Sequence, residues 1–377
     1  MTTSWGAVSP RGRPSRTEVY ARFESAANDL KRLGGLPSPS EAAGIWDDIW
    51  HLEAHNSTAL EGNTLILREV QVLLDTGRAV GAKELKDYLE VTGYADAAKW
   101  VYTQAHTAHD WDSSGLITVT EIRHIHTVAM SAVWEVAPHP EADPQEGPGS
   151  FRRHDLNLFG GGMTPPPWTQ IRSQLHGWIH TAVELGQHTA AGAMPAHELP
   201  LRLARLQCSF ETIHPFLDGN GRAGRLLLNL LLVRLGWPPA IIFKRSRDRY
   251  LDALDRADHG DDGPLAELIA RSVLDNLQRL VVPHIAGPAR LIPCSPWPAR
   301  PSATPHYAKR PPEVDSRQKS DPTDCGAPTN TPSTPTSPTA TNAGHTAPPP
   351  PDQLAPSPSL SIGVLTDAVQ HNGSGHP

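Results

Sequence analysis

Residues 214–225 read HPFLDGNGRAGR, and residues 226–235 continue as LLLNLLLVRL. The second segment is apolar on almost every side, which is typical of a helix buried at the centre of a bundle. Gly236 and the Trp-Pro-Pro after it predict the end of this helix. Residues 199–213 carry an apolar stripe at helical spacing, which predicts a second core helix leading into His214. The sequence therefore predicts a helical core with a polar loop between two buried helices.

The polar loop combines residue types that suit a polyphosphate. Gly219 and Gly221 can take the positive φ angles that turn successive backbone N–H groups toward one anion at the start of a helix. Arg222 and Arg225 are three positions apart, so on a helix that begins near Gly221 they share a face and can reach the same polyphosphate. Asp218 has the wrong charge to bind phosphate, but its oxygens suit a hard cation such as Mg²⁺. A nucleoside triphosphate with magnesium fits this set.

His214 lies directly before the loop. The ordinary pKa of histidine, about 6.5, suits a general base that acts on an attacking hydroxyl group. Gly-Asn-Gly alone is a common turn, and His-Pro before a helix is more often structural than catalytic. Their combination at this spacing predicts chemistry rather than binding alone. Packing of an aromatic ring against the core accounts for Phe216.

The loop resembles the signature of Fic-domain proteins, His-Pro-Phe-x-Asp/Glu-Gly-Asn-Gly-Arg-x-x-Arg, and each fixed position of that signature is present. The resemblance covers about residues 45–275. It implies an all-α, Fic-type helical bundle with a small β-hairpin flap. It also implies a protein adenylyltransferase, which transfers AMP from ATP to a Ser, Thr or Tyr hydroxyl of a target protein and releases pyrophosphate.

The resemblance implies a role for each residue of the loop. His214 would take the hydroxyl proton, Asp218 would hold Mg²⁺, Arg222 would stabilise the leaving pyrophosphate and Arg225 would hold the γ-phosphate. The residues expected to contact the nucleotide are Gly219, Asn220, Gly221, Arg222, Gly224, Arg225 and Tyr250. Tyr250 begins a Tyr-Leu-Asp-Ala-Leu segment that resembles the family's helix beside the adenosine pocket, although core packing explains an amphipathic tyrosine equally well.

A second motif, STALEGN at residues 57–63, resembles the inhibitory motif of regulated Fic proteins. Glu61 could pair with Arg225 and so occupy the cation that the γ-phosphate needs. A net stabilisation of about 1–3 kcal/mol would lower the competent population roughly 5- to 150-fold. The alternative is a simple helix end, because a Glu followed by Gly and Asn often terminates a helix. Some members of the family also remove AMP by using the same glutamate to position a water.

Residues 151–167 interrupt the helical pattern. Leu156 to Phe159 alternate weakly in polarity, and three glycines at 160–162 precede three prolines at 165–167. We expect a short hairpin, which by resemblance is the flap that binds the target segment by strand-like backbone pairing. A plain loop between two helices is the alternative.

The chain of 377 residues is expected to have three parts. Residues 1–112 would form an N-terminal helical region with the inhibitory helix, and residues 113–285 the Fic catalytic domain. Residues 286–377 are rich in Pro, Ser and Thr, and such a tail buries too little apolar surface to offset its ordering entropy. Docking of the short apolar stretch Leu360–Val369 remains open. Further helices are predicted from Thr17 onward and over residues 45–52, 67–74, 82–105, 120–132 and 168–185.

Composition narrows the function class and the partners. A net charge of −7 argues against nonspecific nucleic-acid binding, which needs a strongly basic face. Three cysteines without ligand spacing indicate a reducing compartment, by default the cytoplasm. No run of about 18 apolar residues predicts a membrane span. We expect ATP and an unidentified target protein as partners, and a homodimer is one way in which Glu61 could be gated.

Two histidines on a predicted helix could suggest a metal site. His124 and His126 are two apart on a helix, so they point in different directions, and we assign both to structure rather than to a metal.

The rival function within enzymes is AMP removal, or transfer of another phosphate-containing group, at the same loop. The rival from another class is a non-catalytic interaction module whose proline-rich tail recruits partners.

Overall fold

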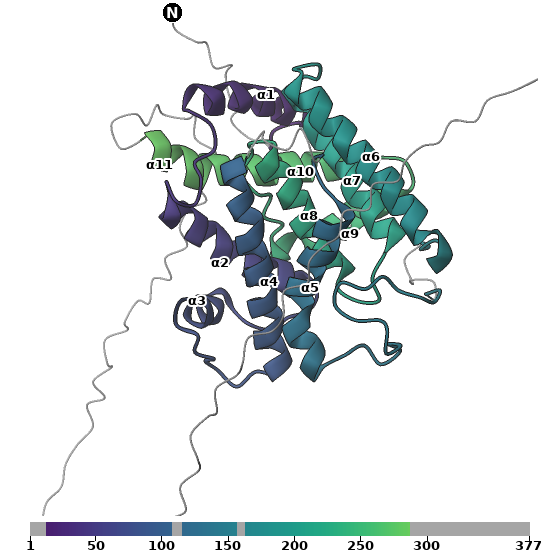
Figure 1. Ribbon diagram of the computed structural model, residues 1–377. Coiled ribbons are helices and arrows are strands. Elements are labelled where there is room, and N and C mark those ends of the chain that lie inside the picture. The colour runs from purple at the N-terminus through teal and green to yellow at the C-terminus, as the bar shows by residue number, and fades with distance from the viewer. Residues whose placement is uncertain (1–12, 108–114, 157–162, 287–377) are drawn as a thin grey trace, which may run out of the picture. The chain divides into compact units, whose positions relative to one another are not determined.

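Helix α8, Asn220–Arg234, lies in the middle of the helices in Figure 1. It packs against α2 (Ala43–Leu60), α4 (Leu85–Thr103), α5 (Val119–Val136) and α7 (Leu199–Ile213). Every residue of α8 except Gly221 is buried. The predicted buried central helix is therefore confirmed, and α7 leads into it through the polar loop, as expected.

The computed structural model describes residues 13–107, 115–156 and 163–286, all within one compact unit. The remaining elements are α1 (Arg16–Arg32), α3 (Leu67–Thr76), η1 (Gln104–Thr107), η2 (Trp168–Gln170), α6 (Ile171–Ala190), η3 (Ala196–Glu198), η4 (Lys244–Ser246), α9 (Arg247–Asp258), α10 (Gly263–Asn276), η5 (Leu277–Val281) and α11 (Val282–Ala286). Within these ranges, no helix combines the length and the apolar character that a bilayer crossing requires.

Polar caps define where two of the helices begin. At α1, the Glu18 N–H donates to Ser15 Oγ over 3.3 Å, and the Ser15 N–H donates to Glu18 Oε2 over 2.6 Å. At α5, Thr118 and Glu121 form the same reciprocal pair. Such capping boxes satisfy N–H groups that have no partner inside the helix. The starts of these helices are thus encoded in four consecutive residues.

The all-α fold class is confirmed. The described parts of the predicted hairpin, residues 151–156 and 163–167, form no strand, while residues 157–162 lie outside the described ranges. The hairpin therefore stays a prediction. The predicted disordered tail also lies outside the described residues, apart from residue 286. The domain boundary at residue 112 stays a prediction as well.

A ladder of polar contacts joins α2 to α8. Asn229 Nδ2 donates to Glu53 Oε1 over 2.8 Å, Arg225 Nε donates to Ser57 Oγ over 2.7 Å, and Arg225 Nη2 donates to Glu61 Oε1 over 2.7 Å. Residues four apart on a helix share a face, so positions 53, 57 and 61 all look toward α8. Glu53 is 2% exposed and anchors the ladder in the core. This register places Glu61 over the start of α8.

Candidate active site

His214 ends α7 in the left-handed backbone conformation. Its φ of 46° and ψ of 60° make it the only non-glycine residue with positive φ among those that the structure describes. Such a conformation persists only where the surroundings hold it. The His214 N–H donates to the Phe210 carbonyl over 3.1 Å, and the His214 carbonyl accepts from Arg152 Nε over 2.9 Å. The backbone of the predicted base is therefore held on both sides.

The imidazole of His214 is suited to accept a proton at Nε2. Its Nδ1 lies 3.3 Å from the Glu211 carbonyl oxygen, so the neutral ring is expected to carry its proton on Nδ1 and a lone pair on Nε2. Burial lowers the pKa of His214 to about 4, although the Glu211 carbonyl acts in the opposite direction. The ring is thus neutral near pH 7, which is the form that a general base requires.

His126 fixes the loop that carries Asp218. Its Nδ1 accepts the Gly149 N–H over 2.8 Å, so Nε2 carries the proton and donates to the Asp218 carbonyl over 2.8 Å. The ring also stacks on Phe216, with centroids 3.7 Å apart. His124 points elsewhere, against Trp100, with centroids 5.0 Å apart. The two rings therefore point in different directions, as expected, and Phe216 is packed in the core.

The two glycines of the loop serve different purposes. Gly219 has a φ of 78°, as the anion-nest prediction requires. The same expectation for Gly221 was wrong, because Gly221 lies in the first turn of α8 and has no positive φ. A Cβ at Gly221 would lie 2.4 Å from Glu61 Oε1, so close approach explains this glycine. The Asn220 side chain clamps Phe216, accepting its N–H over 2.9 Å and donating to its carbonyl over 2.8 Å.

Arg222 is buried beside the loop, and some of its N–H groups lack an acceptor within the described ranges. It is 4% exposed, and its guanidinium forms ion pairs of 3.4 Å with Glu90 and 3.5 Å with Asp218. Among the described residues, its Nε and Nη1 have no hydrogen-bond acceptor. Asn63, the last residue of the second motif, donates to the other oxygen of Glu90 over 3.0 Å. A buried cation with unsatisfied donors is what a phosphate site requires.

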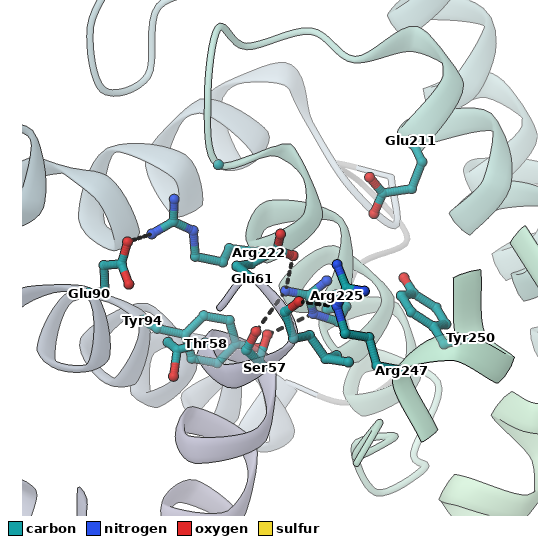
Figure 2. Close-up of polar contacts among 12 residues, drawn as sticks. Ser57, Thr58, Glu61, Glu90, Tyr94, Glu211, Arg222, Arg225, Arg247 and Tyr250 are labelled. Carbon is teal, nitrogen blue, oxygen red and sulfur yellow. Dashed lines mark hydrogen bonds and ion pairs between the residues drawn. The ribbon is translucent and has the colours of Figure 1, made fainter. Parts of the chain in front are cut away.

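Arg225 is the centre of the predicted inhibitory contact, which Figure 2 shows with Ser57 and Glu61 converging on its guanidinium. Burial by itself would raise the pKa of Glu61, but the charge of Arg225 outweighs it and the pKa is lowered. Burial would lower the pKa of Arg225, yet Glu61 raises it overall. Each group therefore holds the other in its charged form. The Glu61 carboxylate lies against Gly221, where the anion site at the start of α8 is predicted.

The alternative interpretation of Glu61 as a helix end is confirmed, while its inhibitory role stays a prediction. Helix α2 ends at Leu60 with Glu61 as its cap, and Gly62 follows with a φ of 101°. Arg247 Nε donates to the Leu60 carbonyl over 2.9 Å and satisfies one of the last carbonyls of the helix. The helix end delivers the carboxylate, so the two interpretations describe one feature.

Asp218 is accessible enough to bind a cation. Its side chain is 45% exposed, and its Oδ1 accepts the Gly219 N–H over 2.6 Å. Over the described ranges, no three His, Cys, Asp or Glu side chains are grouped to hold a metal ion. Magnesium at nucleotide sites usually takes one or two carboxylates together with phosphate oxygens and water. A single accessible carboxylate beside the anion nest fits that pattern.

Tyr250 and Gly224 lie on the α7 side of the site. Gln207 Nε2 donates to Tyr250 Oη over 3.2 Å and to Glu211 Oε1 over 2.9 Å. A Cβ at Gly224 would lie 2.4 Å from Glu211 Oε1, and Tyr250 is 2% exposed. Close packing of α8 and α9 on α7 accounts for both residues. Their predicted contact with the nucleotide stays a prediction.

Sequence reasoning missed three residues that organise the site. Arg152 holds the His214 carbonyl, Glu90 pairs with Arg222, and Asn63 was included in a motif but given no partner. No local pattern separates the buried Arg152 from the exposed Arg153 beside it. Glu90 is buried in α4, where a carboxylate is costly unless it is paired, but no local pattern marks it as buried.

Comparison with known proteins identifies the domain. Residues 116–232 match the Fic/DOC family. The chain is a Fic-domain protein. The Fic domain begins just before α5 and ends inside α8, so the family match covers His126, the polar loop and both arginines, whereas Glu61 lies before it.

Curated relatives carry the name "Protein adenylyltransferase Fic". The one from Culex quinquefasciatus is 34% identical over 254 residues, which are 67% of this chain and 45% of that protein. The one from Aedes aegypti is 33% identical over 277 residues, 68% of this chain and 50% of that protein. The chain thus spans about half the length of the curated relatives it matches.

Two solved structures share the Fic fold. Fic-1 (residues 134–508) from C. elegans has a TM-score of 0.55 at 24% identity, covering 70% of this chain and 72% of that one. A Fic-domain signaling protein from Bacteroides thetaiotaomicron has a TM-score of 0.51 at 23% identity, covering 70% of this chain and 95% of that one. At these identities the likeness shows the fold.

Proposed function

We propose that the protein is an adenylyltransferase that moves AMP from ATP to a Ser, Thr or Tyr hydroxyl of a target protein and that Glu61 restrains it in cis. The observation that carries the proposal is the start of α8, where the buried cations of Arg222 and Arg225 flank an anion site closed by one carboxylate. A neutral His214 lies at the end of the preceding helix. The name shared by the curated relatives supports the same reaction.

The reaction needs one proton transfer and one displacement. His214 Nε2 takes the proton of the target hydroxyl, the hydroxyl oxygen bonds to the α-phosphorus, and the bond to the bridging oxygen breaks to release pyrophosphate. Arg222 stabilises the charge that develops on the pyrophosphate, and Arg225 binds the γ-phosphate. Asp218 would hold Mg²⁺, which when bound with ATP neutralises phosphate charge. The N–H groups in the first turn of α8 orient the α- and β-phosphates.

The regulatory part of the proposal follows from competition for Arg225. Glu61 and a γ-phosphate need the same guanidinium, and both are anions that suit the start of a helix. ATP can still bind while Glu61 stays in place, but its phosphates then miss the in-line pose. The Glu61 side chain is 39% exposed, so it can also reach a water. This exposure keeps AMP removal by the same site as a second candidate function.

The remaining expectations concern partners and compartment. We propose that the target segment binds near residues 151–167, because Arg152 of that segment donates to the His214 carbonyl and also to the His154 carbonyl. Homodimerisation would be one way to gate Glu61, and light scattering across protein concentrations tests it. Cys208 is buried as a free thiol, which suits the proposed cytoplasmic location.

Self-labelling with ATP tests the function. Glu61→Gly protein is incubated with Mg²⁺ and ATP labelled at either the α- or the γ-phosphate. We expect label only from α-labelled ATP, and a mass increment of one AMP on the protein. His214→Ala in the same background should abolish labelling, while His180→Ala, at an exposed position of α6, should leave it unchanged. Label from γ-labelled ATP, or full labelling of the His214→Ala variant, would refute the proposal.

A further inference from the structure

Among the described residues, Arg152 is the largest charged side chain that is fully buried. Its guanidinium donates hydrogen bonds to backbone carbonyls. Its Nε donates to the His214 carbonyl over 2.9 Å, its Nη1 to the His154 carbonyl over 3.0 Å and its Nη2 to the Pro166 carbonyl over 2.6 Å. The residue is 1% exposed. One guanidinium thus joins the catalytic loop to both described arms of the 151–167 segment.

A buried arginine without a close carboxylate partner lowers the stability of the fold. Burying a charge is unfavourable, and a paired carboxylate is the usual remedy. The ion-pair partner here is Asp155, whose Oδ1 lies 3.9 Å away and whose side chain is 66% exposed. Burial accordingly lowers the pKa of Arg152. Three carbonyl oxygens therefore carry most of its stabilisation, and their geometry is set by the rigid fork of the guanidinium.

The contact with His214 falls where the backbone needs support. His214 has the positive φ described above, and its carbonyl is the group that Arg152 binds. The Arg152 N–H also donates to the Pro215 carbonyl over 2.9 Å, so two successive carbonyls after the base are held by one residue. Loss of either hydrogen bond would allow the backbone at His214 to rotate and would change the direction of the imidazole.

We propose that Arg152 is a positioning residue that sets the aim of the His214 imidazole and registers the two arms of the 151–167 segment against it. The inference rests on the proposed function, because it assigns the residue that orients the base of that reaction. Arg152 touches neither ATP nor the reacting hydroxyl. Its contribution is geometric, and misplacement of a catalytic group by about 1 Å can lower the rate about 100-fold.

The kinetic test compares three substitutions in the Glu61→Gly background, and a fourth, Arg152→Ala, serves for chemical rescue. Arg152→Met removes all donors and the charge, whereas Arg152→Lys keeps the charge but cannot bind three diverging carbonyls at once. Arg172→Ala is the matched control, since Arg172 is an exposed arginine of α6. Initial rates of AMP incorporation over a range of ATP concentrations give kcat and the KM for ATP, and thermal melting reports the fold of each variant.

We expect Arg152→Met to lower kcat about 100-fold and Arg152→Lys about tenfold, with the KM for ATP within about threefold of the parent. Arg172→Ala should stay within about twofold in both constants. Addition of millimolar guanidinium chloride to an Arg152→Ala variant should restore part of kcat, and it should not rescue His214→Ala. A purely structural arginine would lower the melting temperature without this split between kcat and KM.

The inference is overturned if folded Arg152→Lys protein keeps kcat within about twofold of its parent, or if the loss lies entirely in the KM for ATP. Should Arg152→Met fail to fold, the Lys variant and the guanidinium rescue decide. Failure of the proposed function looks different, because the Glu61→Gly parent itself would then transfer no AMP.

Discussion

Replacing Glu61 with glycine is the perturbation that tests the restraint most directly. The ion pair joins Arg225 Nη2 and Glu61 Oε1 over 2.7 Å, and the side chains are 5% and 39% exposed. At an effective dielectric constant of about 20, the Coulomb attraction at this distance is about 6 kcal/mol. Desolvation of the arginine and the half-exposed carboxylate offset much of it and leave about 1–3 kcal/mol. The active population should therefore rise roughly 5- to 150-fold.

The assay is the initial rate of self-labelling by α-labelled ATP at a concentration below saturation. Glu61→Gln keeps the volume over Gly221 but removes the charge, so we expect a rate between those of the parent and of Glu61→Gly. Asp75→Asn is the matched control, because it removes a carboxylate that pairs with His51 of α2 at 2.7 Å, away from Arg225. It should leave the rate unchanged.

Competition between Glu61 and the γ-phosphate for Arg225 can be tested with a double variant. In an Arg225→Ala background the Glu61→Gly substitution should give no further acceleration, because the cation for which the two anions compete is gone. An equal acceleration with and without Arg225 would show that Glu61 acts by another route. No acceleration in the parent, with folding and ATP binding intact, would show that the ion pair is no brake.

Two further predictions concern stability. Gly224→Ala would place a Cβ 2.4 Å from Glu211 Oε1 and should lower the free energy of unfolding, measured in urea, by about 1–3 kcal/mol. Gly177→Ala is the control: this position of α6 has open space around it, and the substitution should raise the free energy of unfolding by about 0.5–1 kcal/mol. Equal effects of the two substitutions would contradict the packing argument. Burial lowers the pKa of His126 and of His214 to about 4, so the unfolded chain binds more protons between about pH 4 and 6.5 and both groups reduce stability as the pH falls through that window. Burial raises the pKa of Glu211 to about 7, and this group acts in the opposite direction between about pH 4.5 and 7. Urea titrations at pH 7.5 and 5 should therefore show a steeper acid loss for Glu211→Gln and a shallower one for His126→Gln than for the parent, and unchanged slopes would contradict the assignment.

Helix α2 shows where sequence patterns stop being informative. The apolar periodicity predicts a helix over residues 45–52, but α2 continues to Leu60. Its second half is polar, and nevertheless Asn56, Ser57 and Thr58 are buried. A polar residue on a buried face breaks the pattern from which helices are predicted. The partners that make this burial tolerable are distant for two of the three: Arg225 is 168 positions from Ser57, and Lys244 is 188 positions from Asn56.

The sequence by itself determined the central buried helix, the loop before it and the residue types proposed to bind phosphate. Those features depend on apolar periodicity and turn chemistry within a few consecutive residues, so they can be read locally. The sequence also singled out Glu61 and Arg225, although it could not show that they meet.

Only the tertiary structure decided which groups converge on the loop. Glu61 and Arg225 are 164 positions apart, His126 and Asp218 are 92 apart, and Arg152 and His214 are 62 apart. The structure also shows that Gly221 has no positive φ and that a Cβ there would lie 2.4 Å from Glu61 Oε1. Contacts of this kind depend on how the helices pack. The residues around a position in the sequence do not indicate which distant residue will contact it.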